Sequence, residues 1–240
     1  MHHTREHHSL LADAERRLLV GIARRLPDAM TSDQLSALAL AAMLAAGPTV
    51  AVIGRTPWAA AAFIGLLAVN WFGDSLDGTL ARVRNRQRPR YGFYVDHVID
   101  LAGTAALVTG IAASGLMTPW IGFALLAAYL IVAAESYLAT HSASVFRMSF
   151  AGIGPTELRL ILAAGAVKAA VDPSVTIFGH EMLLFDVGGI VAIVGLLAAF
   201  VVSATRNTID LYRAEPLPPA TQRHTTEDAG KNLVLRACAE

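Results

Sequence analysis

Long apolar segments separated by short polar connections dominate the chain. Six of them hold enough residues for an α-helix, which rises about 1.5 Å per residue, to cross the ~30 Å hydrocarbon core of a bilayer. The pattern therefore predicts an all-α integral membrane protein with six transmembrane helices. The expected helices lie at about 33–53, 57–83, 92–114, 118–143, 155–171 and 181–205, the last continuing as helix to Tyr212.

Residues 8–26 show a different, amphipathic pattern. Apolar residues such as Leu11, Leu18 and Ile22 recur at helical spacing, and arginines such as Arg17 flank the face that they form. The pattern predicts a helix that lies on an anionic membrane surface or packs on the protein's own core, and one helix can do both.

Basic residues predict the orientation of the helices. Arginines gather in the connection 83–91 and in the C-terminal tail, and the connection 144–154 carries Arg147, whereas Arg55 and Lys168 lie at the opposite ends of the helices. By the positive-inside rule the arginine-rich side is cytoplasmic, and an even number of spans places both termini there. In a bacterium this membrane would be the plasma membrane. The expected parts are a cytoplasmic N-terminal segment at 1–30, a six-helix transmembrane domain at 31–212 and a disordered cytoplasmic tail at 213–240.

The composition narrows the possible classes of protein. Of the 240 residues, 55% are hydrophobic and 16% are charged, whereas about 25% are charged in an ordinary soluble domain. The formal net charge is zero, so the sequence predicts no nucleic-acid partner. Cys238 is the single cysteine, which excludes an intrachain disulfide and a cysteine-based metal site. The N-terminal histidines can bind metal, but their position favours a solvated tail.

Four aspartates interrupt the apolar pattern between Gly73 and Asp100. Asp74 and Asp77 are three residues apart, and Asp96 and Asp100 are four apart, so each pair shares one face of its helix. The short connection between the two helices makes them antiparallel neighbours. We therefore expect all four carboxylates to converge just below the cytoplasmic interface.

Such a cluster of carboxylates predicts a metal site, because four uncompensated negative charges at one point would repel one another. Ligands that are all oxygen favour Mg²⁺ or Mn²⁺. Four carboxylates can hold two ions, the arrangement that is typical of phosphoryl or nucleotidyl transfer. One of the carboxylates can also act as a general base for an attacking hydroxyl. Neighbouring small residues, Gly78, Ala81 and Gly92, leave room for a ligand or for close helix packing, and Arg82 can bind a phosphate.

The same stretch resembles the CDP-alcohol phosphotransferase (CDP-alcohol phosphatidyltransferase) family, whose signature is D-x2-D-G-x2-A-R-x8–9-G-x3-D-x3-D. The matching residues are Asp74, Asp77, Gly78, Ala81, Arg82, Gly92, Asp96 and Asp100, with nine residues between the arginine and the second glycine. The resemblance implies an enzyme of phospholipid biosynthesis that transfers a substituted phosphate group from a CDP-alcohol to an acceptor alcohol and releases CMP. It makes the transmembrane domain the catalytic domain.

The resemblance also implies a role for each matched residue. The implied ligands of the two Mg²⁺ or Mn²⁺ ions are Asp74, Asp77, Asp96 and Asp100. Asp100 is in addition the implied base that deprotonates the acceptor hydroxyl. The residues implied to form the CDP pocket are Gly78, Ala81, Arg82 and Gly92.

The sequence does not identify the donor and the acceptor. The donor is of the CDP-diacylglycerol or of the CDP-choline/ethanolamine type. The sequence around His97 and the segment 154–157 are similar to choline/ethanolamine phosphotransferases, whereas Arg147 and Arg159 can supply a basic pocket for an inositol phosphate. Each arginine also has another reading: Arg147 as an orienting loop charge, and Arg159 as an ion-pair partner of an acidic residue. The candidate acidic partners of Arg159 are Glu135, which can also contact substrate, and Glu157.

Two other functions fit parts of the pattern. A UbiA-type membrane prenyltransferase would use Asn70 with Asp74 as its first acidic motif and Asp96 with Asp100 as its second, but such proteins separate the two motifs widely. A divalent-cation transporter would need polar residues along the whole path across the membrane, and few are present. Membrane lipids are expected partners, and small-residue faces at 188–189 and 198–199 allow either a homodimer or packing within the chain.

Overall fold

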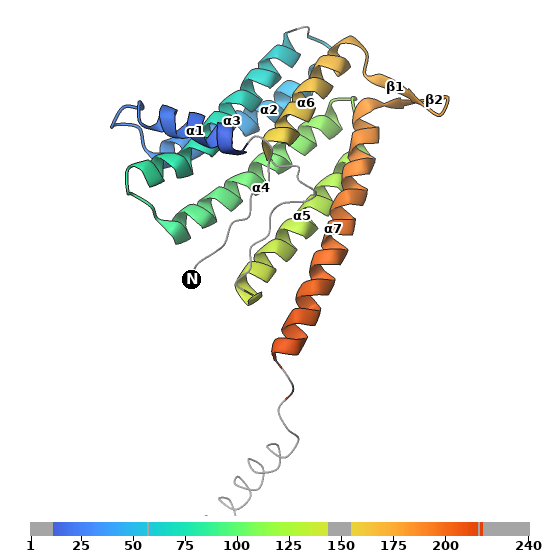
Figure 1. The fold of residues 1–240 in the computed structure, drawn as a ribbon. Coiled ribbons are helices and arrows are strands. Elements are labelled where there is room, and N and C mark those ends of the chain that lie inside the picture. Colours follow the sequence, from blue (N-terminus) through green and yellow to red (C-terminus); the bar gives the residue numbers. More distant parts are fainter. Residues whose placement is uncertain (1–11, 57, 144–154, 216, 218–240) are drawn as a thin grey trace, which may run out of the picture. The chain divides into compact units, whose positions relative to one another are not determined.

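The computed structural model describes residues 12–56, 58–143, 155–215 and 217, which form seven helices and one two-stranded hairpin (Figure 1). The helices are α1 (Ala12–Ala23), α2 (Ser32–Val50), α3 (Ala59–Val83), α4 (Pro89–Ala113), α5 (Pro119–Ala143), α6 (Pro155–Val171) and α7 (Leu184–Ala214). The chain divides into two compact units, Met1–Val201 and Val202–Glu240, and α7 crosses the boundary. The N-terminal histidines, Arg147 and Cys238 lie outside the described residues.

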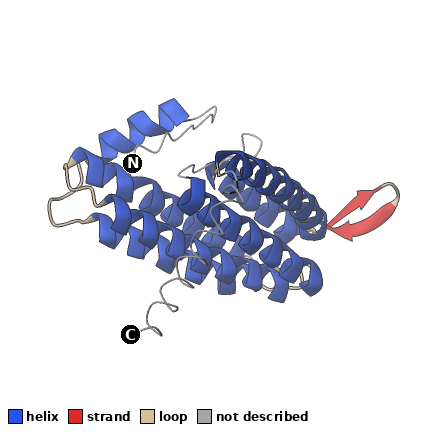
Figure 2. Ribbon diagram, turned by 90° about the horizontal axis from the view of Figure 1, so that it is seen from below, coloured by secondary structure: helices blue, strands red, loops and turns tan. Residues whose placement is uncertain are grey.

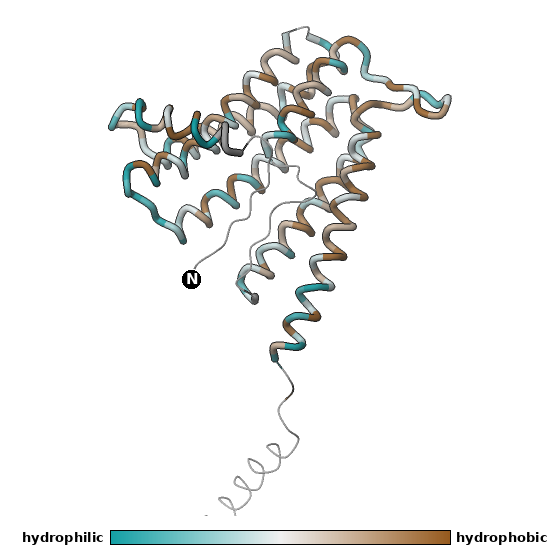
Figure 3. Tube along the Cα trace, in the orientation of Figure 1, coloured by the Kyte–Doolittle hydropathy of each residue, from teal (hydrophilic) through white to brown (hydrophobic). Residues whose placement is uncertain are grey.

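Five of the described helices, α2, α3, α4, α5 and α7, are long and apolar enough to cross a membrane. Figure 3 shows apolar residues along these helices, and polar residues at the connection between α3 and α4 and toward the end of α7. The predicted all-α membrane protein is thereby confirmed. α6 begins and ends where the sequence predicted, but its 17 residues are fewer than the ~20 of a typical span, so the sixth crossing stays a prediction.

Close backbone contacts hold α3 and α4 on the central helix α2. A Cβ added to Gly110 of α4 would overlap the carbonyl group of Gly47 in α2. A Cβ added to Gly73 of α3 would lie 2.6 Å from the carbonyl oxygen of Leu35 in α2. Small residues let helix backbones approach in this way in membrane proteins. Packing therefore accounts for Gly73, and these contacts fix α3 and α4 against one common helix.

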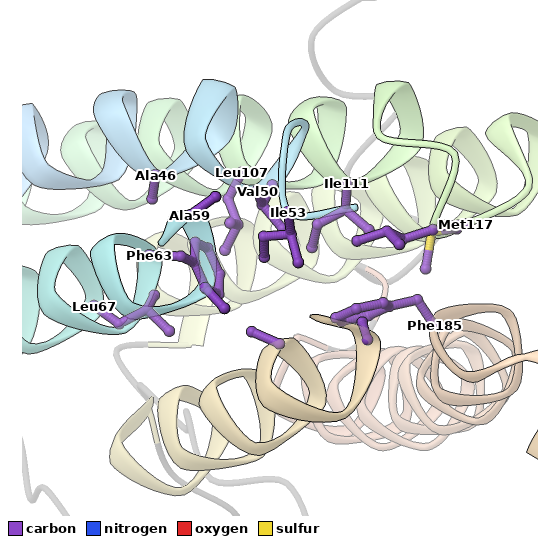
Figure 4. Packing of buried hydrophobic residues seen from close by; sticks show 14 residues of the cluster. Ala46, Val50, Ile53, Ala59, Phe63, Leu67, Leu107, Ile111, Met117 and Phe185 are labelled. Carbon is purple, nitrogen blue, oxygen red and sulfur yellow. The ribbon is translucent and has the colours of Figure 1, made fainter. Parts of the chain in front are cut away.

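The main hydrophobic core lies where one end of α2, α3, α4, α6 and α7 meets (Figure 4). Val50 at the end of α2 and Phe63 near the start of α3 are fully buried. Ile111 near the end of α4 and Phe185 at the start of α7 join the same cluster. The apolar residues of these ends therefore anchor the bundle, while the ends that carry the aspartates lie away from this core.

A second cluster holds α1 against α3. Leu19 and Ala23 of α1 pack with Leu76 and Leu80 of α3, and these side chains are buried. Leu18, on another face of α1, is 54% exposed. Of the two readings of the amphipathic segment, packing on the protein's own core is therefore observed, and contact with the membrane surface stays a prediction.

Two arginines of the connection between α3 and α4 make specific contacts. Arg84 donates hydrogen bonds to the carbonyl oxygens of Leu26, Pro27 and Met30, which follow α1. Arg88 pairs with both carboxylate oxygens of Asp33, and this hydrogen bond raises the pKa of Arg88 above its usual value. The connection is therefore tied to the segment between α1 and α2, in addition to carrying the charges that predict orientation.

A β-hairpin replaces the start of the last predicted helix. Strand β1 (Ser174–Ile177) pairs antiparallel with β2 (His180–Leu183), shown in red in Figure 2. Phe178 and Gly179 form the turn with φ values of 50° and 81°, the positive angles of a type I′ turn. The sequence predicted the helix from about residue 181, but α7 begins at Leu184 because the preceding residues pair as a strand.

Candidate active site

The four aspartates come from two consecutive helices that both pack on α2. Asp74 and Asp77 lie on α3, and Asp96 and Asp100 lie on α4. The carboxylate of Asp100 is close enough to those of the other three to interact with them electrostatically. Asp77 interacts in the same way with Asp74 and Asp96. The structure thus brings the four residues together, as their helical spacing predicted.

Asp77 is held by the start of α2. Its carboxylate accepts hydrogen bonds from the hydroxyl of Ser36 and from the backbone N–H of Gly78. The hydroxyl of Ser32 donates to the backbone carbonyl of Asp77 at 2.9 Å. Neither contact was predicted from the sequence, although a spacing of four residues places both serines on one face of α2.

Asp74 is held by Arg159 of α6. The Nη2 atom of Arg159 lies 2.6 Å from Oδ2 of Asp74, and its Nε atom donates to Oδ1 of Asn70 at 2.8 Å. Both side chains of the ion pair are largely buried, at 16% and 24% exposure. The sequence suggested Glu135 or Glu157 as the ion-pair partner of Arg159. Asp74, 85 residues away in the chain, is a partner that the sequence did not suggest.

Aromatic residues pack around His97, which follows the first aspartate of α4. His97 is buried next to Asp96, its Nδ1 atom lies 2.6 Å from the carbonyl oxygen of Phe93, and its ring stacks on that phenylalanine. Tyr137 of α5 meets the His97 ring edge-on. His97 therefore packs α4 against α5. Tyr137 and Tyr129 of α5 also lie near enough to Asp100 to interact electrostatically.

The residues expected to form the CDP pocket lie at the ends of α3 and α4 nearest their connection. Arg82 is exposed, and its Nη2 atom donates to the hydroxyl of Thr79 at 3.0 Å. A Cβ added to Gly78 would lie 3.4 Å from Nη1 of Arg82, so the guanidinium rests over this glycine. A Cβ on Gly92 would meet nothing within 4 Å. Packing therefore does not account for Gly92, while Ala81 is half-buried on α3.

The donor set suits a hard divalent cation. All four candidate ligands are carboxylates, and their mutual electrostatic interactions show that they share one region. Within the described residues, no three acidic or histidine side chains are grouped tightly enough to hold a metal ion as they stand. The carboxylate of Asp74 instead meets Arg159, and that of Asp77 meets Ser36. The four carboxylates are of the right chemical type and lie near one another, so they fit a metal ion. Their side chains would have to rotate to bind it.

Comparison with known protein families identifies the family of this chain. The sequence model of the family described as CDP-alcohol phosphatidyltransferase matches residues 25–203. The matched range contains the four aspartates, the arginine and glycines between them, and Arg159. No curated protein matches the chain.

Proposed function

The chain belongs to the CDP-alcohol phosphatidyltransferase family, and we propose that it transfers a substituted phosphate group from a CDP-alcohol to an acceptor alcohol with release of CMP. Family membership makes it a membrane-embedded transferase of phospholipid synthesis. The observation that carries the specific reaction is the clustering of Asp74, Asp77, Asp96 and Asp100, which come from two helices at the spacing of the family signature.

The four carboxylates are proposed to hold two Mg²⁺ or Mn²⁺ ions. The family generally uses divalent metals, which supports this assignment. Bound there, the ions would neutralise negative charge on the phosphates of the donor and on the leaving CMP. In the same reading Ser36 orients Asp77, because its hydroxyl hydrogen-bonds that carboxylate.

Asp100 is proposed as the general base. Its carboxylate accepts the proton of the acceptor hydroxyl, and the resulting oxygen attacks the β-phosphorus of the CDP-alcohol. A new P–O bond forms to the acceptor, the P–O bond to the bridging oxygen breaks, and CMP leaves with the electron pair. Arg82, whose guanidinium rests over Gly78, binds a donor phosphate, and the open space at Gly92 admits the nucleotide.

The active site is proposed to face the cytoplasm. The aspartates lie toward the ends of α3 and α4 that meet the connection carrying Arg84, Arg86 and Arg88, and Arg90 lies in the first turn of α4. Positive charge on that side predicts a cytoplasmic location and attracts an anionic donor and anionic lipids. The proposed topology puts both termini on the same side.

The experiment that tests the proposal is a screen for CMP release. Purified protein with Mg²⁺ or Mn²⁺ is offered CDP-diacylglycerol, CDP-choline or CDP-ethanolamine together with lipid, inositol-phosphate or glycerol-phosphate acceptors. CMP release that depends on both the donor and an acceptor supports the proposal and identifies the pair. Transport of the cation without CMP release from any pair would favour a transporter instead.

A further inference from the structure

Arg159 has no role in the proposed reaction, and yet it contacts Asp74, one of the four carboxylates of the site. It lies on α6, and its guanidinium joins two residues of α3 that are one helical turn apart, Asn70 and Asp74. The bond to Asp74, at 2.6 Å between charged groups, is of the short and strong kind. The guanidinium also interacts electrostatically with Asp100 of α4.

The position of the guanidinium is fixed by a chain of hydrogen bonds. Nε of Arg159 donates to Oδ1 of Asn70, and Nδ2 of Asn70 donates to the carbonyl oxygen of Ala39 in α2 at 3.1 Å. Asn70 is only 4% exposed. Because this anchor does not involve the aspartates, the arginine can keep its bond to Asn70 when its Nη2 atom gives up Asp74.

Arg159 and a divalent cation would make conflicting demands on the site. Both are attracted by the same carboxylates, and both seek the oxygens of Asp74. Two positive groups near one carboxylate also repel each other, and the limited exposure of this pair, 16% and 24%, weakens the screening by solvent.

We propose that Arg159 competes with the divalent cation for the carboxylate of Asp74 and thereby sets the cation concentration at which the site fills. The inference rests on the proposed function, because it takes Asp74 as a metal ligand. Arg159 is then a regulatory residue: it keeps the carboxylate cluster partly neutralised and makes metal binding weaker than four aspartates alone would allow.

The test is a titration of the full-length protein in detergent with Mn²⁺ alone, in which the electron paramagnetic resonance signal of free Mn²⁺ reports binding. Arg159→Gln removes the charge but can still donate to Asn70. Its Mn²⁺ dissociation constant is expected to fall roughly tenfold, the size of effect typical of a lost charge-assisted hydrogen bond. Arg159→Lys keeps the charge and is expected to stay near the wild-type value.

Lys168→Gln is the matched control, since it removes an ion pair from the same helix at the opposite end from the site. It should leave Mn²⁺ binding unchanged. The proposal would be overturned if Arg159→Gln bound Mn²⁺ with unchanged or weaker affinity. It would also be overturned if Arg159→Lys increased the affinity for Mn²⁺ as much as Arg159→Gln does. Thermal unfolding in detergent checks that each variant is folded.

The same titration separates this inference from the proposed function. Asp77→Asn should weaken Mn²⁺ binding in the wild-type background. If it does, and Arg159→Gln changes nothing, the competition alone is wrong. If the wild-type protein binds no Mn²⁺, or Asp77→Asn leaves binding unaltered, the metal site itself is wrong, and the competition falls with it.

Discussion

Gly110 of α4 lies directly against the carbonyl group of Gly47 in α2, with no room for a side chain between the two helices. Gly110 is ten residues after Asp100, about 15 Å along the same helix. The contact therefore sets the depth and tilt at which α4 presents Asp96 and Asp100 beside α3. A pair of glycines far from the chemistry thus helps to position it.

Gly110→Ala should destabilise the protein by about 1–3 kcal/mol or more, because the added methyl group meets backbone that cannot move aside. Gly188→Ala is the control, since a Cβ there would meet nothing within 4 Å, and it should be neutral or slightly stabilising. Thermal unfolding in detergent measures both. Equal midpoints of thermal unfolding for the two variants would show that α2 and α4 leave room for a methyl group at Gly110.

Asp186 has a structural role in this account. It is 8% exposed, and its carboxylate accepts hydrogen bonds from the backbone N–H and the hydroxyl of Thr118 at 2.6 and 2.7 Å. These bonds join the start of α7 to the residue that precedes α5. Asp186→Asn should cost about 1–3 kcal/mol of stability, because a buried donor loses its acceptor. CMP release per folded molecule should not change. A large loss of turnover at unchanged stability would instead assign Asp186 to the reaction.

Arg84→Ala should loosen the N-terminal helix. The substitution removes the hydrogen bonds to the carbonyl oxygens of Leu26, Pro27 and Met30 that tie the end of α1 to the connection after α3. Hydrogen–deuterium exchange of the segment 17–30 should become faster, while that of α2 stays the same. Arg86→Ala, an exposed arginine of the same connection, is the control and should leave the exchange unaltered.

Arg82→Gln should raise KM for the CDP-alcohol roughly tenfold, because a neutral amide replaces the guanidinium and the charge-assisted bond to phosphate is lost. Arg86→Gln removes the same charge from the neighbouring connection and should change KM by much less. The measurement is the rate of CMP release as a function of donor concentration. Equal effects of the two variants would mean that the connection attracts the donor through its net charge and that Arg82 makes no specific contact.

Local patterns in the sequence predicted much of this structure. Apolar runs located the helices, and α6 ends before Asp172-Pro173, as a proline-terminated pattern indicates. The spacings of Asp74 with Asp77 and of Asp96 with Asp100 placed each pair on one helix face, and the short connection predicted that the pairs meet. These features depend on helical periodicity, which is visible in the spacing of residues along the chain.

Features that depend on contacts between distant parts of the chain could not be predicted from the sequence. The partner of Arg159 is a residue of α3, and nothing near Arg159 in the chain indicates Asp74. The hairpin was missed for another reason. Only Gly179 signals a turn, while Phe178 adopts a positive φ that its residue type does not favour. The four residues of β2 run directly into the apolar sequence of α7, so they resemble the first turn of that helix.

The central claim is that the carboxylates of α3 and α4 carry out metal-dependent transfer from a CDP-alcohol. Its most direct test is the rate of CMP release, with and without Mg²⁺ or Mn²⁺, for the donor and acceptor that the screen identifies. The wild-type protein should release CMP only with the ion present, and chelation should stop it. The variants that should each lose at least about 100-fold in rate are Asp74→Asn, Asp77→Asn, Asp96→Asn and Asp100→Asn. Asp172→Asn, at the far end of α6, should keep the full rate. Metal-independent release, or wild-type release by Asp100→Asn, would contradict the account.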